Sequence, residues 1–278
     1  MNMTPPIVRM ADGTIKQVNP LSGTEVWTVP GRANRPLPAA TPAPEPVDTS
    51  KHGRHCAFCY DRYTETPPEK ARVIHDDGWH TLVDVPAREL TATTAEFRRI
   101  PNLFEILPLD YWQANYNYQI PPQVIARRDA YLADPAGRTH VLAVIRAKLA
   151  ASGFTPEEVD ALGEKDLLPY ADAFFASGHD VIVARRHYRD GATCQSELAS
   201  SGSLTPEEHA HYISMAVETM RDLYRKYPQA SYVAAFQNWL RPAGASFDHL
   251  HKQLVAIDER GVQAEREIAQ VEADPLVY

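Results

Sequence analysis

The order of strand-like and helical runs in the last hundred residues constrains the fold more than any other feature. The run 179–186, HDVIVARR, reads as a buried strand. After it, Thr205-Pro206-Glu207-Glu208 combines a helix N-cap, a proline at the first helical position and a capping-box glutamate. Two further strand-like runs follow, 231–238 and 252–258. This order predicts an α+β fold in which an antiparallel pair of strands lies beside a long helix.

We expect the long helix to span residues 205–227 and to bury one face against the sheet. Its apolar residues recur with the helical period of 3.6. Those expected on the buried face are Ile213, Val217, Met220, Tyr224 and Tyr227. A second helical region runs from 111 to 177, where Thr155-Pro156-Glu157-Glu158 repeats the start signal. The aromatic residues at its beginning are expected to be packing residues: Tyr111, Trp112, Tyr116 and Tyr118.

The chain divides along its length into four segments. Residues 1–50 hold short strand-like runs and a proline-rich connector. Residues 51–110 hold a Cys-x-x-Cys loop and the first strands of the main sheet. Residues 111–177 form a helical insert. Residues 178–278 form a core that carries the alternating histidines discussed below and end in a charged amphipathic helix.

Charge and composition exclude several classes of protein. The formal net charge is −8 and no long run of Lys and Arg occurs, so we expect no nucleic-acid partner. No stretch approaches the roughly 18 consecutive apolar residues of a membrane span. The N-terminus lacks the apolar region of a signal peptide, so we expect a cytoplasmic protein with no membrane partner. Three cysteines are too few, and odd in number, for a disulfide framework.

Two histidines and a glutamine alternate late in the chain. In a strand, residues two apart share a face, so His249, His251 and Gln253 are expected to line one surface. Imidazole, with an unperturbed pKa of about 6.5, suits a nucleophile near neutral pH. One ring nitrogen can attack phosphorus while a hydrogen bond to the other sets the tautomer, and the glutamine amide can donate to a phosphoryl oxygen. For a bare His-x-His pattern, a pair of surface histidines on an edge strand is the better explanation.

The loop before these residues argues against a pair of surface histidines. Gly244, Ala245 and Ser246 leave backbone N–H groups unshielded for an anion, and the Ser246 hydroxyl adds a donor. Such donors stabilise the charge that develops in a phosphoryl-transfer transition state. Together with Asn238 and the alternating residues, the loop favours a catalytic site over surface histidines.

These residues resemble a known family. Asn238-x5-Gly244-x-Ser246-x2-His249-x-His251-x-Gln253 is similar to the active-site motif of galactose-1-phosphate uridylyltransferase, a branch of the histidine-triad superfamily. Further motifs in the same order resemble that family: Asn19-Pro20-Leu21-x-Gly23 with Arg32-x2-Arg35-Pro36, Cys56-x2-Cys59, Pro101-Asn102-Leu103-Phe104, and Gly178-His179-Asp180-Val181 with His187. The sequence departs from the family at Gln237, Leu250 and Lys252, where an acid, a proline and a glycine are usual. The resemblance implies a histidine-triad half-barrel of antiparallel strands with the long helix packed across it.

The resemblance also implies a nucleotidyltransferase that works through a covalent nucleotidyl-histidine. His251 would attack the α-phosphorus of a nucleoside diphosphate sugar, and a sugar 1-phosphate would then take the nucleotidyl group, as in galactose metabolism. Ser246 and Gln253 would contact the transferring phosphoryl group. The implied substrate contacts are Arg32, Arg35, Asn102, Asn238 and Gly244. Taken alone, the two arginines are better explained as surface charges, Asn102 as the cap of a turn and His179 as a hydrogen-bonding residue at a strand start.

By the same resemblance, Cys56, Cys59, His187 and His249 would bind zinc. Two thiolates and two imidazoles make a closed structural site, which would leave His251 free to react. A reduced or redox-active cysteine pair is the alternative. Other histidines close to the cysteine loop are alternative ligands: His52, His55, His75 and His80. Cys194 is expected to be a buried small residue.

Two other functions stay open. A histidine-triad phosphorylase or hydrolase of dinucleoside polyphosphates would share the nucleophile and differ in the acceptor. A non-catalytic, zinc-stabilised nucleotide-binding module would form no covalent intermediate. The chain ends where the family would begin a second, related half, and the family completes its active site across a dimer. A homodimer is therefore a further expectation, and the sequence predicts neither the sugar nor the base.

Overall fold

The chain forms two compact units. The computed structural model describes residues 6–30, 45–240 and 243–277. The smaller unit comprises Met1–Ala43 with Glu259–Tyr278, and the larger unit comprises Pro44–Asp258. The helical insert belongs to the larger unit, together with the cysteine loop and the main sheet. The C-terminal amphipathic helix, expected with the catalytic core, is grouped with the N-terminal strands instead.

The smaller unit contains a three-stranded antiparallel sheet and one helix. Its elements are β1 (Ile7–Arg9), β2 (Ile15–Val18), β3 (Glu25–Thr28) and α8 (Val262–Ala273). The turn between β2 and β3 is closed by Asn19, whose Oδ1 accepts hydrogen bonds from the backbone N–H groups of Leu21 and Ser22. Gly23 in the same turn has a φ of 69°, which glycine adopts without the steric cost that a side chain would bring. The short strand-like runs predicted within residues 1–50 are therefore confirmed by β2 and β3.

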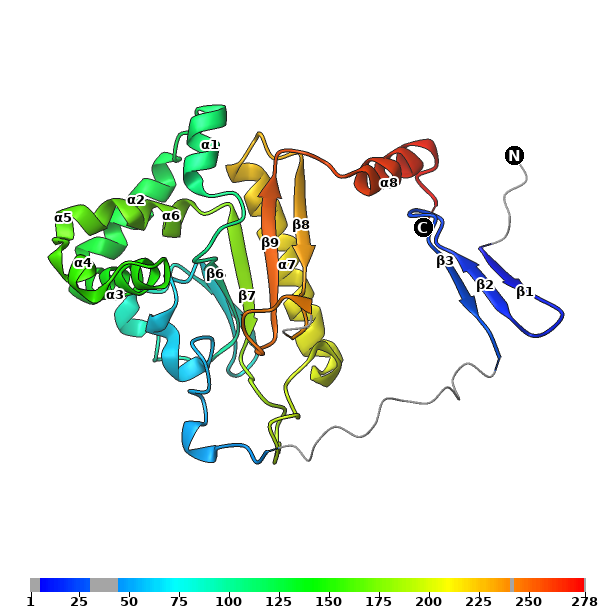
Figure 1. Cartoon of the computed structure of the whole chain (residues 1–278), viewed down its shortest axis with the longest axis horizontal. Coiled ribbons are helices and arrows are strands. Elements are labelled where there is room, and N and C mark those ends of the chain that lie inside the picture. Colours follow the sequence, from blue (N-terminus) through cyan, green and yellow to red (C-terminus); the bar gives the residue numbers. More distant parts are fainter. Residues whose placement is uncertain (1–5, 31–44, 241–242, 278) are drawn as a thin grey trace. The chain divides into compact units, whose positions relative to one another are not determined.

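The larger unit is built on a six-stranded antiparallel sheet with the order β5-β4-β6-β7-β9-β8. Figure 1 labels β6, β7, β9 and β8 of this sheet. The strands are β4 (Ala71–His75), β5 (Trp79–Val83), β6 (Ala95–Pro101), β7 (His179–Ala184), β8 (Tyr232–Phe236) and β9 (His251–Ile257). The predicted α+β class and the antiparallel arrangement are confirmed. β9 begins at His251, so His249 precedes the strand and does not continue its face, contrary to the expectation.

The long helix α7 (Pro206–Lys226) begins as predicted. Thr205 Oγ1 accepts from the Glu208 N–H, and the Glu208 carboxylate accepts from the Thr205 N–H. The expected buried face is wrong for Ile213, Val217 and Tyr224, which are 39–42% exposed, whereas Tyr227 is buried and Met220 partly buried, as expected. The buried apolar and small residues are Tyr212, Met215, Ala216, Thr219 and Leu223. Ala216 and Thr219 are small, so this row lets the helix approach the sheet more closely than the bulkier neighbouring row would.

The region between β6 and β7 is helical, as predicted. It contains α1 (Leu109–Tyr116), α2 (Pro122–Ala133), α3 (Pro135–Ala151), α4 (Pro156–Ala161), α5 (Glu164–Leu167) and α6 (Ala171–Ala176). These helices pack around a cluster in which Trp112 and Tyr118 are buried and which also includes Tyr227 and Ala256. The rings of Tyr111 and Tyr116 also pack on Trp112, as expected, and their hydroxyl groups donate to the Asp258 carboxylate, both at 2.5 Å. The insert contacts the segment that follows the Cys-x-x-Cys loop, because His140 Nε2 lies 2.8 Å from Thr66 O.

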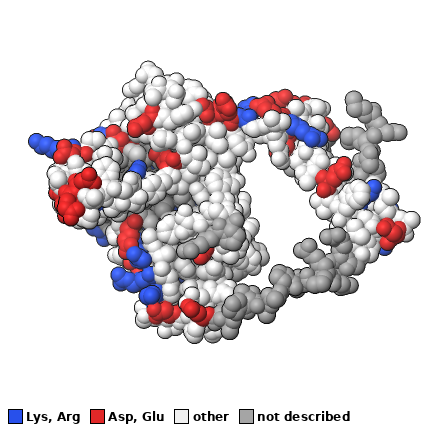
Figure 2. Space-filling view, in the orientation of Figure 1, with Lys and Arg blue, Asp and Glu red and all other residues white. Residues whose placement is uncertain are grey.

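Short 3-10 helices connect these elements. Their bounds are Thr49–Lys51, Tyr60–Glu65, Ala87–Glu89, Leu168–Tyr170 and Ser201–Ser203. On the face drawn in Figure 2, acidic and basic side chains are interspersed with one another. Within the described ranges, no helix combines the length and the apolar character needed to cross a membrane.

The two faces of the sheet have different neighbours. Side chains that alternate along a strand point to opposite faces. Ile182 of β7 and Leu254 of β9 pack in one cluster with α7. The intervening residues Val181 and Gln253, which are paired in register, line a cavity on the other face. α7 thus closes one face of the sheet and leaves the other for a site.

Candidate active site and metal centre

A cavity of about 570 Å³ lies on the face of the sheet opposite α7. This volume is typical of sites for small-molecule ligands. Much of its wall is apolar, and the larger apolar residues are Phe58, Ile100, Leu103, Phe104, Ile106, Phe236 and Phe247. The residues that can form hydrogen bonds in it include Asn102, His179, Asn238, Ser246, His251 and Gln253. An apolar wall with a few converging polar groups is the usual form of a binding site.

His251 is the first residue of β9 and faces this cavity. Its ring is 5% exposed and lies edge-on to Phe58, with ring centroids 5.4 Å apart. Nδ1 lies 2.7 Å from His249 O, and a carbonyl can only accept, so Nδ1 carries the hydrogen. Burial lowers the pKa of His251. A neutral ring with Nδ1 protonated leaves the lone pair on Nε2, which suits a nucleophile.

The loop between β8 and β9 brings polar groups to the same cavity. Gly244 has a φ of 88°, a conformation that favours glycine. Asn238, Gly244 and Ser246 all line the cavity, as does Phe247, which packs on Phe58 with ring centroids 4.4 Å apart. The expected proximity of this loop to His251 and Gln253 is therefore found in the structure.

Four ligand-type side chains meet beside the cavity. The sulfur atoms of Cys56 and Cys59 and the Nδ1 atoms of His187 and His249 lie within 4.8 Å of one another. The two sulfur atoms are 3.8 Å apart, and the four sulfur–nitrogen distances are 3.4, 3.5, 3.7 and 3.8 Å. Tetrahedral zinc with ordinary bond lengths would need about 3.8 Å between sulfurs and about 3.5 Å between sulfur and nitrogen. The four residues therefore fit a tetrahedral metal ion.

Hydrogen bonds in and around the cluster favour ligand atoms that can bind a cation. His249 is 1% exposed, and its Nε2 lies 2.6 Å from Ala184 O, so Nε2 donates and the Nδ1 lone pair faces the sulfurs. The hydrogen bond between the thiols lowers the pKa of Cys59 and raises that of Cys56. The two cysteines are free thiols, not a disulfide. Such an arrangement supports a metal centre better than a redox pair.

The structure also places the other residues singled out in the sequence. His52, His55, His75 and His80 are not part of the four-residue cluster, which is the metal-type group found among the described residues. Cys194 is partly exposed instead of buried, because its loop lies at the surface. Arg32 and Arg35 lie outside the described residues.

Sequence reasoning missed part of the site. His179, expected to be a structural residue, begins β7 as predicted but also lines the cavity. Phe58 and Phe247 form its aromatic wall. The alternation from His179 to Val181, which share a strand face, was the signal available in the sequence for His179. No comparable signal marks the two phenylalanines, because they come from loops.

Known proteins were compared with the chain. A search of curated proteins found no match. A solved structure of an ADP-glucose phosphorylase from Arabidopsis thaliana with bound ADP-glucose shares 16% identity at a TM-score of 0.43, over 93% of this chain and 53% of that one. A galT-like protein from the same plant shares 15% identity at the same TM-score, over 93% and 52%.

This chain thus spans about half the length of those two structures. A family model matches residues 10–278, which is nearly the whole chain. The protein therefore belongs to the family described as Domain of unknown function (DUF4921).

Proposed function

We propose that this protein is a nucleotidyltransferase that forms a covalent nucleotidyl-histidine on His251. The observation that carries the proposal is the hydrogen bond between His251 Nδ1 and His249 O, which directs the free lone pair of a cavity-lining imidazole to Nε2. Ser246 and Gln253 line the same cavity and can donate to phosphoryl oxygens. A nucleophile, nearby donors and an enclosed apolar wall are the parts that nucleophilic phosphoryl transfer requires.

The proposed reaction has two steps. In the first, His251 Nε2 attacks the α-phosphorus of a nucleoside diphosphate sugar, an N–P bond forms, and the bond from phosphorus to the bridging oxygen breaks. The sugar 1-phosphate leaves with that oxygen. In the second step, an oxygen of the acceptor attacks the same phosphorus and the N–P bond breaks. The hydrogen stays on Nδ1, which donates it to His249 O.

We propose zinc for the metal centre, held by Cys56, Cys59, His187 and His249. A closed site with four protein ligands has no open position for substrate, so its contribution is structural. His249 is both a ligand and the residue whose carbonyl holds His251. The metal would therefore hold the backbone from which the nucleophile is oriented.

Intact mass measurement after incubation with donors tests the proposal. The panel contains UDP-glucose, UDP-galactose and ADP-glucose, the last because it is bound in one similar structure. We expect the mass of one nucleoside monophosphate on the wild-type protein, mapped by peptide analysis to His251. The His251→Asn variant should gain no mass. As a matched control, the His80→Ala variant, altered at an exposed histidine, should be labelled like wild type.

The acceptor is identified in a second experiment with the labelled protein. Isolated nucleotidyl-protein is mixed with a sugar 1-phosphate, with inorganic phosphate or with water alone, and the released nucleotide is analysed. Rapid release by a sugar 1-phosphate supports a uridylyltransferase-like transferase, and release by phosphate or water supports a phosphorylase or hydrolase. A folded, metal-loaded protein that binds nucleotide but never gains mass would contradict the enzyme and favour the binding module. The homodimer and the cytoplasmic location remain predictions.

A further inference from the structure

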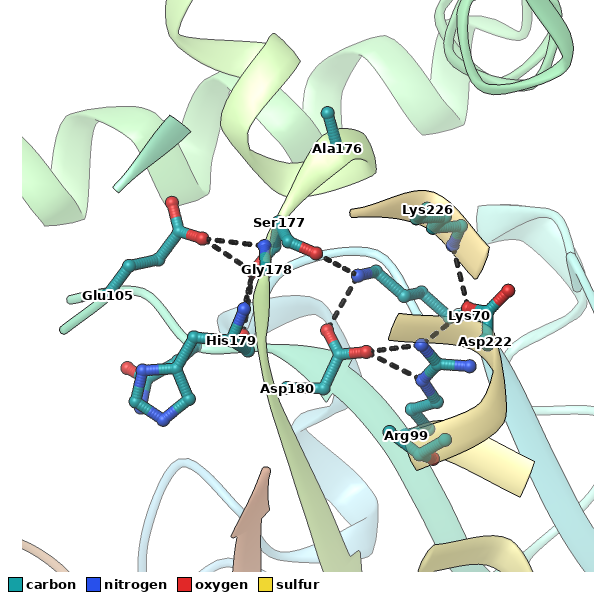
Figure 3. A network of polar contacts seen from close by, with 12 residues as sticks. Lys70, Arg99, Glu105, Ala176, Ser177, Gly178, His179, Asp180, Asp222 and Lys226 are labelled. Carbon is teal, nitrogen blue, oxygen red and sulfur yellow. Dashed lines mark hydrogen bonds and ion pairs between the residues drawn. The ribbon is translucent and has the colours of Figure 1, made fainter. Parts of the chain in front are cut away.

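His179 begins β7 at the floor of the cavity and is 1% exposed. Figure 3 shows its ring on the opposite side of β7 from the Asp180 carboxylate. That carboxylate lies 2.6 Å from Lys70 Nζ and 2.7 Å from Arg99 Nε in a buried ion-pair network. These ion pairs hold β7 on the face opposite the cavity, so the His179 ring has little freedom to move.

The hydrogen bonds of His179 determine its tautomer. The backbone N–H of Ile106 donates to Nδ1 at 3.2 Å, so Nδ1 must present a lone pair. The hydrogen of the neutral ring is then on Nε2. Burial lowers the pKa of His179, which favours this neutral form. Nε2 lies 3.0 Å from Gln253 Oε1 and donates to it.

A second backbone N–H determines how the Asn102 amide is oriented. Phe104 N–H donates to Asn102 Oδ1 at 2.9 Å, which identifies that atom as the oxygen. Asn102 Nδ2 is therefore a donor, and it lies 3.2 Å from Gln253 Oε1. Its 3.1 Å distance from His179 Nε2 is then a contact between two donors directed at the same oxygen.

The Gln253 amide is thereby held in one orientation. Its oxygen accepts from both His179 and Asn102. A flip of the amide would place its own N–H groups against these two donors and lose both hydrogen bonds. Among the residues that the structure describes, none accepts a hydrogen bond from Gln253 Nε2. Gln253 and His251 are two residues apart on β9 and line the same cavity. The free N–H groups are thus the part of the amide available to a ligand.

We propose that His179 is a positioning residue that acts through Gln253, because it holds the amide so that only its donor side meets the transferring phosphoryl group. The inference rests on the proposed function, in which that group becomes bonded to His251. It also names what this part of the cavity accepts, which is an oxygen with lone pairs and not a donor group. A preorganised donor contributes most where charge develops in the transition state.

The test measures how fast the wild-type protein and four variants form the nucleotidyl-protein, by rapid quench and intact mass, with donor affinity measured separately. His179→Phe keeps a ring and removes both hydrogen bonds. His179→Gln places an amide N–H near the position of Nε2 and serves as the conservative rescue. We expect the first to lower the rate constant at saturating donor by about 10–100-fold with less than about 3-fold change in Kd. The second should stay within about 5-fold of wild type.

The double variant distinguishes positioning from a merely structural role. If His179 acts through Gln253, then His179→Phe combined with Gln253→Ala should be no slower than Gln253→Ala alone. Three results would overturn the inference and leave the proposed function intact. They are a rate loss in the double variant equal to the product of the two single losses, a wild-type rate in His179→Phe, and a slow His179→Gln variant. Wild-type protein that forms no nucleotidyl-histidine would overturn both.

A readout independent of activity completes the test. Nitrogen NMR of the imidazole groups should show His179 with the hydrogen on Nε2, and this tautomer should persist in His251→Asn. A hydrogen on Nδ1 would overturn the inference even in a protein that turns over normally. Thermal unfolding and metal content, measured for every variant, show whether each remains folded.

Discussion

The ring of His251 is held by the backbone of His249, with Nδ1 and the carbonyl oxygen 2.7 Å apart. The ring of His249 is directed away, with Nδ1 3.5 Å from Cys56 Sγ. Two histidines separated by one residue therefore belong to two different sites. Because one peptide segment contributes to both, a change in the Cys56, Cys59, His187 and His249 cluster should alter the orientation of the proposed nucleophile, His251.

The first prediction concerns that coupling. Cys59→Ser should lose most of the bound metal and destabilise the protein by about 3–5 kcal/mol, because the cluster loses one of its two thiolates. The rate of nucleotidyl-protein formation should fall with it. Metal analysis, thermal unfolding and intact mass measure the three effects. Cys194→Ser is the control, because Cys194 is not part of the cluster. Full metal content in Cys59→Ser would contradict the assigned ligands.

The second prediction concerns the loop donor. Ser246→Ala should lower the rate of nucleotidyl-protein formation by about 10–100-fold, because a donor aimed at the phosphoryl group is lost. Ser246 is exposed to the cavity, so stability should change by less than about 0.5 kcal/mol. Rapid-quench mass analysis and denaturant unfolding separate the two. An unaltered rate would remove Ser246 from the catalytic group.

The third prediction concerns pH and Glu105. Burial raises the pKa of Glu105 to about 7, and its Oε1 accepts from Ser177 Oγ and the Gly178 N–H (Figure 3). Since the folded-state pKa exceeds the unfolded value of 4.5, the contribution to stability is present below pH 4.5 and is lost as pH rises to about 7. Glu105→Gln keeps the acceptor and removes the ionisation, so it should not show this loss.

The measurement is denaturant unfolding of wild type and Glu105→Gln between pH 4.5 and 8. The variant should gain on the order of 2 kcal/mol relative to wild type across that range. Glu157→Gln, at an exposed helix start, should follow the wild-type curve. Parallel curves for Glu105→Gln and wild type would show that Glu105 ionises as freely in the folded protein as in the unfolded chain.

The fourth prediction concerns the buried ion pairs behind His179. Burial alone would raise the pKa of Asp180, but the charges of Arg99 and Lys70 lower it. Asp180→Asn leaves Lys70 without its carboxylate and Arg99 with Asp222 alone, so it should cost about 3–5 kcal/mol. The exposed pair Arg221–Glu218 is the control, and Arg221→Ala should cost less than about 1 kcal/mol. Equal costs in denaturant unfolding would mean that the network is not held away from water.

Local signals in the sequence predicted the elements well. The capping boxes at Thr155 and Thr205 both form, because each depends only on residues within one turn. The buried face of α7 was missed, because apolar residues occupy two adjacent rows and the choice between them depends on the sheet. Tyr212 and Ile213 show this: the first is fully buried and the second is 42% exposed.

Contacts between distant segments were beyond the reach of the sequence pattern. The cluster of Cys56, Cys59, His187 and His249 was expected only through the resemblance to a family, and the structure brings these residues together. No sequence motif predicted the hydrogen bond between Ser177 and Glu105 or the ion pair between Lys70 and Asp180. Each joins residues that become neighbours only when the sheet has formed.

The proposed metal ligands also bear on the order in which the chain acquires its structure. Cys56 is separated by 131 residues from His187 and by 193 from His249, so of the four clustered side chains a nascent chain first offers only the two thiols. Full coordination requires that the neighbouring ends of β7 and β9 have already been paired. If the cluster binds a metal as proposed, tight uptake should therefore follow completion of the sheet, and an incompletely assembled chain should release the ion to competing chelators.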